Sequence, residues 1–265
     1  MKSLIEHPAG RALSARSLTL VCRLEVGLPR LLLAWVILAG AACGLRLAFS
    51  ATPMNGTAEG IANALPYALV VGVPVATVLF GLSAFPASAL HAQPTTRLAR
   101  LGDWKGVGAI AARSMPLYGA SGLMASLMIG ILINVPVRTL EFLTGIPALG
   151  GMPPEWFRTL YTLMVWDLLL LSSLYGFAFV LALRHIPLFP RFLAGVWVMD
   201  ILMQICIARI MGQIAHLPRD VAASLADLLE GNLKKVLISV AIWLPYLVFS
   251  RRVNLTYRWR VPAAR

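Results

Sequence analysis

Hydrophobic positions along the chain form long uninterrupted runs separated by short polar and basic segments. The clearest pair covers residues 156–183 and 192–211, on either side of the basic turn 184–191. About 20 apolar residues at about 1.5 Å rise per residue match a bilayer hydrocarbon core of about 30 Å. The two runs therefore predict a hairpin of two membrane-spanning helices.

The rest of the chain repeats this pattern. Four further apolar runs are long enough to cross a membrane: residues 28–49, 61–85, 116–136 and 233–249. Pro66 and Pro74 remove backbone donors inside the second of them and predict a bend there. The expected fold is an all-α polytopic transmembrane helix bundle of six spans.

The polar segments divide this bundle. The expected parts are a cytoplasmic or interfacial segment 1–27, a two-span hairpin 28–85, a basic cytoplasmic loop 86–115, a four-span membrane unit 116–249 and a basic cytoplasmic tail 250–265. Pro218 and Asp220 predict a helix start and Gly231 a stop, which gives a short interfacial helix before the last span. A cleaved signal peptide is the competing interpretation of the N-terminus, but the charged leader is long and Arg46 interrupts the following run.

Small residues recur at a spacing of four in two of the spans. Gly40 and Gly44 form a GxxxG pair, and Gly122, Ser126 and Gly130 form a second stripe. Small side chains let helix backbones approach closely in membranes. These stripes predict helix contacts, with ordinary close packing as the alternative.

The distribution of charge predicts the orientation. Most Lys and Arg residues fall in the N-terminal segment, the 86–115 loop, the 184–191 turn and the tail, whereas the loop 50–60 contains none. Because basic residues favour the cytoplasmic side, both termini are expected to be cytoplasmic.

Composition agrees with a membrane protein. The chain is 59% hydrophobic and 13% charged, with a mean hydropathy of +0.79, compared with about 45–50% apolar and about 25% charged residues in soluble domains. The net charge of +12 is dispersed between the spans, which argues against nucleic acid and favours anionic lipid headgroups. Cys22, Cys43 and Cys206 form no metal-ligand or disulfide pattern. No metal site and no cofactor is predicted.

Several charged and polar residues fall within the predicted spans. Counted from the 184–191 turn, Asp167 and Arg209 lie at roughly 25 and 27 Å, and Arg46 comes to about 24 Å on its own span. Asp200 is closer to the turn, at about 13 Å, with Gln204 one helical turn beyond it. Equal depth predicts an Asp167–Arg209 ion pair with Arg46 as a third member, because an unpaired charge in the membrane is costly.

Two interpretations of these residues stay open. The pair and a hydrogen-bonded Asp200 can be structural, or Asp167, Asp200 and Gln204 can line a polar path for protons or a small cation.

One motif resembles a catalytic site. The segment from Gly119 to Gly122 has the GxSG form of rhomboid intramembrane proteases, and His216 follows an alanine as their histidine does. The predicted topology places Ser121 and His216 on opposite sides of the membrane, too far apart for proton transfer. No catalytic residue is therefore predicted, and the protein is expected not to be an enzyme.

The C-terminal sequence carries a family resemblance. Trp243-Leu244-Pro245-Tyr246, followed by Ser250-Arg251-Arg252-Val253-Asn254-Leu255-Thr256-Tyr257, resembles the C-terminal signature of a family of small bacterial inner-membrane proteins with a domain of unknown function. The resemblance covers roughly residues 101–259. It implies a multi-pass protein of the bacterial inner membrane and carries no activity or catalytic residue.

Basic and aromatic residues alternate in the tail. The residues expected to contact lipid headgroups are Arg251, Arg252, Tyr257, Arg258, Trp259 and Arg260.

Two function classes follow. The first is a non-enzymatic accessory, regulatory or immunity-type protein that packs against a membrane-protein partner or a second copy of itself. The second is a small-solute or proton/cation transporter that uses Asp167, Asp200 and Gln204. Inverted repeats would favour transport, and the sequence shows no such symmetry.

Overall fold

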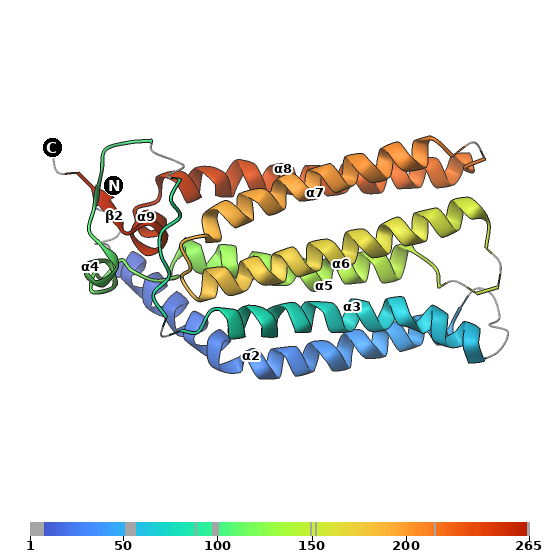
Figure 1. The fold of residues 1–265 in the computed structure, drawn as a ribbon, viewed down its shortest axis with the longest axis horizontal. Coiled ribbons are helices and arrows are strands. Elements are labelled where there is room, and N and C mark those ends of the chain that lie inside the picture. The colour runs from blue at the N-terminus through green and yellow to red at the C-terminus, as the bar shows by residue number, and fades with distance from the viewer. Residues whose placement is uncertain are drawn as a thin grey trace.

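The part of the chain that the structure describes folds into six long helices, which run side by side along most of the length of the molecule (Figure 1). The computed structural model describes residues 8–50, 57–87, 89–96, 101–148, 150–151, 153–214 and 216–263. The long helices are α2 (Pro8–Ala48), α3 (Thr57–Ala84), α5 (Leu123–Gly145), α6 (Glu155–Leu183), α7 (Phe189–Gly212) and α8 (Arg219–Phe249). All six are long and apolar enough to span a membrane. The predicted six-span helical fold is confirmed, and the described parts of both chain ends lie at the same end of the bundle.

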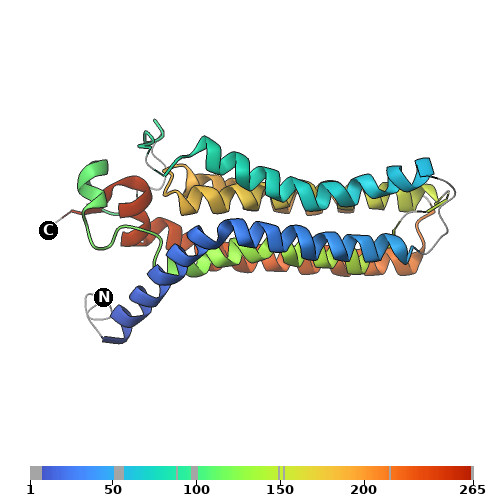
Figure 2. The ribbon, with the colours of Figure 1, turned by 90° about the horizontal axis from the view of Figure 1, so that it is seen from below.

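The helices form two layers of three. Helices α3, α6 and α7 pack in one layer, and α2, α5 and α8 lie in the other, as the view from below shows (Figure 2). Contacts of α2 with α3, α5 with α6 and α7 with α8 join the layers. The first two helices therefore pack directly against the later four.

Helices α3 and α6 approach each other closely at two glycines. A Cβ added at Gly81 would lie 3.1 Å from Val180, and one at Gly176 would lie 3.6 Å from Val78. The predicted stripes play no such role within the chain, because a Cβ at Gly40, Gly44 or Gly130 would meet no described atom within 4 Å.

Helix α2 is longer than predicted. It includes Pro8 to Ala48 without a break, so the described part of the predicted 1–27 segment is not separate from the first span. Pro29 lies inside the helix, and its N-terminal part diverges from the bundle (Figure 2). An ion pair of 2.5 Å between Glu25 and Arg184 links this diverging part to the α6–α7 turn.

Three predicted helix boundaries are wrong. The third span begins at Leu123, because Gly119 and Gly122 adopt positive φ and keep the preceding residues irregular. It continues past Pro136 to Gly145. Likewise the predicted short helix and last span are one helix, α8, which passes through Gly231 without a left-handed turn.

The end of the bundle that holds both chain ends carries a folded cap. Its elements are β1 (Trp104–Gly106), α4 (Ala109–Arg113), α9 (Arg251–Arg258) and β2 (Arg260–Pro262). The two strands pair antiparallel, with Lys105 opposite Val261. Ser250 caps the start of α9, and Trp259 ends it in the left-handed conformation. The predicted basic loop and basic tail thus fold together.

Candidate functional site

Charged residues from three helices meet inside the bundle. Arg138 on α5 donates through Nη1 to Oδ2 of Asp167 on α6 at 3.1 Å. Its Nη2 lies 2.6 and 2.5 Å from the two carboxylate oxygens of Asp200 on α7. One guanidinium therefore bridges two carboxylates, and we call Arg138, Asp167 and Asp200 the charge cluster.

Neutral polar groups complete the coordination of the charge cluster. Tyr175 donates its hydroxyl to Asp200 Oδ2 at 2.8 Å, and Gln204 donates its amide to Asp167 Oδ1 at 3.1 Å. The Nε of Arg138 donates to Asn134 Oδ1 at 3.0 Å. Each charged side chain is thus fixed by at least one neutral partner as well as by its ion pairs.

Helix α8 extends the network. Asn232 donates to Gln204 Oε1 at 3.4 Å. Lys235, one turn further on, forms an ion pair with Glu141 of α5. The polar network therefore connects α5, α6, α7 and α8.

The charge cluster is buried and contains two acidic side chains for one basic side chain. Asp200 is 0% exposed, Gln204 3% and Asp167 5%. With both carboxylates ionised the cluster has one more negative than positive charge, while the Lys235–Glu141 pair beside it is neutral. A net charge held within a membrane bundle is unfavourable unless a counter-charge or a proton joins it.

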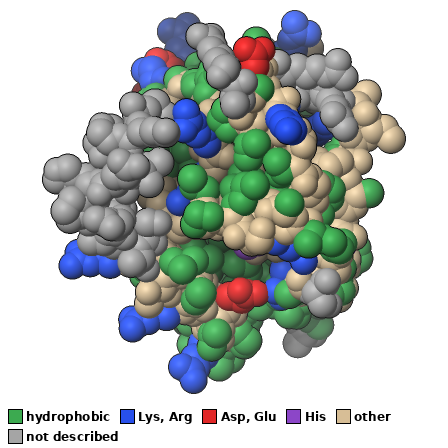
Figure 3. All heavy atoms as spheres, turned by 90° about the vertical axis from the view of Figure 1, so that its left-hand side faces the viewer, with side chains coloured by type: hydrophobic (Ala, Val, Ile, Leu, Met, Phe, Trp, Pro, Cys, Tyr) green, Lys and Arg blue, Asp and Glu red, His purple; other side chains and the backbone are tan. Residues whose placement is uncertain are grey.

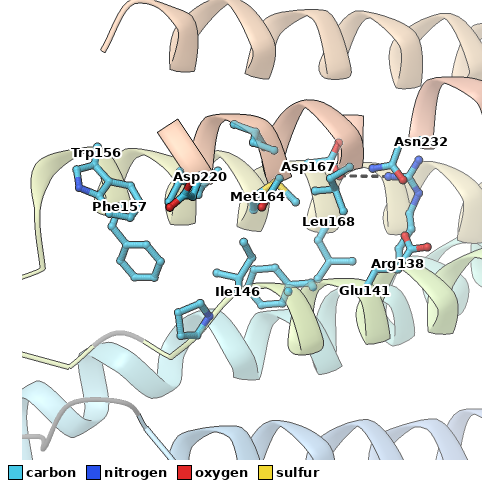
Figure 4. A pocket seen from close by; sticks show the side chains of 18 residues that line it. Arg138, Glu141, Ile146, Trp156, Phe157, Met164, Asp167, Leu168, Asp220 and Asn232 are labelled. Carbon is cyan, nitrogen blue, oxygen red and sulfur yellow. Dashed lines mark hydrogen bonds and ion pairs between the residues drawn. The ribbon is translucent and has the colours of Figure 1, made fainter. Parts of the chain in front are cut away.

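A cavity of about 450 Å³ opens beside the charge cluster, between α5, α6 and α8. Arg138, Asp167 and Asn232 gather at one end of it, whereas Trp156 and Phe157 lie at the other (Figure 4). Most of the remaining wall is apolar. Such a volume is in the range of small-molecule sites.

The predicted Asp167–Arg209 pair is wrong. Asp167 pairs with Arg138, and Arg209 is exposed on α7. Arg46 also has a different partner, because its Nε donates to the carbonyl of Ile146 at 3.3 Å. The three residues expected at one level therefore do not meet.

The predicted end of the third span explains the missed partner. The third span was expected to end at Pro136, which placed Arg138 in a loop, whereas α5 continues and carries Arg138 into the bundle. In addition, α7 begins at Phe189, so Asp200 lies about 16 Å from the turn rather than about 13 Å. If the third span is continued past Pro136, the sequence places Arg138 inside a membrane-spanning helix.

Most of the tail residues expected at lipid headgroups have partners within the protein. Tyr257 is completely buried, and its hydroxyl donates to the Ala182 carbonyl at 2.9 Å. Arg258 donates to the Leu247 carbonyl at 2.7 Å, and Arg252 donates to Ser121. Tyr257 is therefore unable to reach headgroups, whereas Arg251 is exposed.

Arg260 and Trp259 also belong to the cap. Arg260 Nε donates to Asn254 Oδ1 at 2.7 Å, and the Trp259 carbonyl accepts from Val107 at 2.9 Å. Both residues lie only partly exposed.

Ser121 and His216 lie at opposite ends of the bundle. Ser121 precedes α5 beside the cap, where its hydroxyl accepts from Arg252. His216 is exposed in the turn between α7 and α8 at the other end (Figure 1). The chain thus holds the two residues of the protease-like motif apart.

No protein-family model, curated protein or solved structure matches this chain.

Proposed function

We propose that the protein is a small multi-pass transporter that moves protons or a small cation, with the charge cluster as its binding group. The single observation that supports this function is a buried cluster in which two carboxylates share one guanidinium and one of them, Asp167, lines a cavity. The proposed location, the bacterial inner membrane, is supported only by the tail resemblance.

The two carboxylates have different surroundings and therefore different proposed roles. Asp200 is held by both the guanidinium and Tyr175 and does not line the cavity, so it serves as the permanent partner of Arg138. Asp167 lines the cavity and shares Arg138 through a single contact. Asp167 is thus the carboxylate placed to accept a proton or a cation.

Neutralising Asp167 tests this role. Asp167→Asn leaves Arg138 with one carboxylate, so the cluster becomes neutral and the fold is expected to keep its stability. Transport should nevertheless fall to the background of empty liposomes. The measurement is cation or proton flux into proteoliposomes under an imposed membrane potential, with a pH-sensitive dye for protons. Asp227→Asn, which removes an exposed acid on α8, is the matched control.

Removing the basic member of the charge cluster tests its contribution to stability. Arg138→Gln strands two buried carboxylates and should lower the free energy of unfolding by about 3–5 kcal/mol. Adding Asp200→Asn to Arg138→Gln should recover part of that loss, which thermal unfolding in detergent would measure. Wild-type protein without any flux, or an Asp167→Asn variant with full flux, would refute the transporter.

A specific observation also favours the accessory function as a second candidate. Gly40 and Gly44 on α2 line a groove of about 630 Å³ whose other wall is α3. A Cβ added at either glycine would meet no described atom within 4 Å, so α3 leaves room at this GxxxG face. Such a face permits close approach of a partner helix or a second copy. If a second copy or a partner helix binds at this face, the double variant Gly40→Leu, Gly44→Leu should lose it, which light scattering in detergent would measure as a lower particle mass.

A further inference from the structure

A second cavity, of about 720 Å³, lies in the cap at the end that holds both chain ends. Its wall combines β1, β2, the start of α7 and the residues around Gln93, which are far apart in the sequence. It is separate from the charge cluster, none of whose members lines it. We call it the cap cavity.

Arginines from three elements line the cap cavity. They are Arg191 in the first turn of α7, Arg258 at the end of α9 and Arg260 in β2. Among the described residues, no Asp or Glu lines it. Lys and Arg side chains are also far more prominent than Asp and Glu on this face of the molecule (Figure 3).

The arginines are oriented by neutral acceptors. Arg258 Nη1 donates to the Leu247 carbonyl and, at 3.0 Å, to Asn254 Oδ1. Arg191 donates to the carbonyl of Thr96. These acceptors hold the guanidinium groups in place without cancelling their charge. Burial first, and then the positive charges of Arg260 and Arg191, lower the pKa of Arg258 to about 10.

Other features of the wall suit an anion with a flat or apolar part. The first turn of the 24-residue helix α7 adds the partial positive charge of a helix N-terminus. Trp104 and Trp259 line the same space, and a Cβ added at Gly106 or Gly108 would meet no described atom within 4 Å. The backbone is therefore accessible to a ligand on that side.

We propose that the cap cavity binds a phosphate group, held between Arg191 and Arg258. Arginine suits phosphate because its planar donors pair with two oxygens at once. The phosphate can belong to an anionic lipid headgroup or to a soluble phosphate compound, and the cavity volume accommodates either.

The test uses the full-length protein in neutral detergent, with pyrophosphate as the soluble probe at constant ionic strength. Tryptophan fluorescence reports binding through Trp104 and Trp259. Arg191→Gln and Arg258→Gln should each weaken binding by about tenfold or more, since a charge-assisted contact contributes about 1.5–3 kcal/mol. Arg258→Lys keeps the charge and should bind more tightly than Arg258→Gln.

A second arm identifies the source of the phosphate. Protein in nanodiscs is titrated with phosphatidylglycerol against phosphatidylcholine, with the same fluorescence readout. A response to pyrophosphate indicates a soluble ligand, and a response to phosphatidylglycerol alone indicates a headgroup. Arg251→Gln, which removes an exposed arginine outside the cavity, is the control in both arms.

The proposal is overturned if neither probe binds more tightly than chloride or phosphatidylcholine. It is also overturned if Arg251→Gln weakens binding as much as Arg191→Gln. Arg191→Gln is the variant expected to leave the fold intact, because the side chain of Arg191 makes only one hydrogen bond, to a backbone carbonyl, among the described residues. Weaker binding in this variant therefore reports the loss of the arginine from the cavity.

Discussion

His185 is the residue whose surroundings most directly predict a pH response. It lies in the turn between α6 and α7 with φ of 55° and stacks edge-on against Tyr118, with ring centroids 5.3 Å apart. Its Nε2 is buried without a hydrogen-bond partner in the described part of the chain. Burial first, and then Arg113 and Arg184, lower its pKa from 6.5 to about 4.

This pKa shift predicts that acid destabilises the fold. Below pH 6.5 the unfolded state takes up a proton that folded His185 accepts only near pH 4. The stability contributed by neutral His185 is therefore complete above pH 6.5 and is lost as the pH falls towards 4, by up to about 3 kcal/mol. His185→Asn keeps a side chain that tolerates positive φ and should flatten this part of the profile.

Thermal unfolding in detergent between pH 7 and pH 4 measures the effect. His216→Asn removes an exposed histidine and is the matched control. Identical pH profiles for wild type and His185→Asn would contradict the prediction.

The candidate site was predictable in part from single residues. Asp167, Asp200 and Gln204 were recognised because polar residues inside apolar runs are rare, and all three belong to the buried network. The sequence pattern does not place their partner Arg138 in a span, because Pro136 stands two positions before it and in soluble proteins a proline usually ends a helix. Within a bundle, neighbouring groups can satisfy the freed backbone acceptors, so α5 continues.

At the scale of elements, Gly81 is a tightly packed position in the contact between α3 and α6. Gly81→Ala would place its Cβ 3.1 Å from Val180, which is tighter than ordinary van der Waals contact. Gly72→Ala makes the same change on the same helix in open space. Both gain about 1 kcal/mol of helix propensity, but only the first incurs an overpacking cost of about 1–3 kcal/mol.

Gly81→Ala should therefore unfold at a lower temperature than Gly72→Ala. Adding Val180→Ala to Gly81→Ala should bring its unfolding temperature closer to that of Gly72→Ala, because Val180→Ala removes the two methyl groups that the new Cβ would contact. Equal unfolding temperatures for the two single variants would show that α3 shifts freely on α6.

The helices themselves followed from the hydrophobic pattern, whereas their contacts did not. A run of apolar residues fixes that a segment crosses the membrane, because length and hydrocarbon thickness must match. It does not fix which small residue faces a neighbour. Thus Gly81 and Gly176, which no sequence motif singles out, meet α6 and α3, while the Gly40–Gly44 motif has open space.

At the scale of the molecule, the six helices and the shared end of the chain termini leave two orientations in the membrane. The folded cap and the start of α7 beside it contain many of the basic residues that predicted a cytoplasmic side, among them Arg191, Arg252 and Arg258. Because basic segments near span ends are retained in the cytoplasm, the cap is expected to face inward. The phosphate site proposed for the cap cavity would then meet cytoplasmic ligands or the inner leaflet.

Reporter fusions test this orientation. Alkaline phosphatase joined after Gly56 or Gly150 should be active, since it is active only outside the cytoplasm, and a green fluorescent protein joined after Gln93 or Arg265 should fluoresce. Reducing the charge bias provides a control, because exchanging Arg252 and Arg258 for Gln removes two positive charges but leaves most basic residues on the same side. The double variant should keep the wild-type reporter pattern. If a green fluorescent protein joined after Gly150 of the wild-type chain fluoresces, the orientation is the opposite of the predicted one and the cap faces outward.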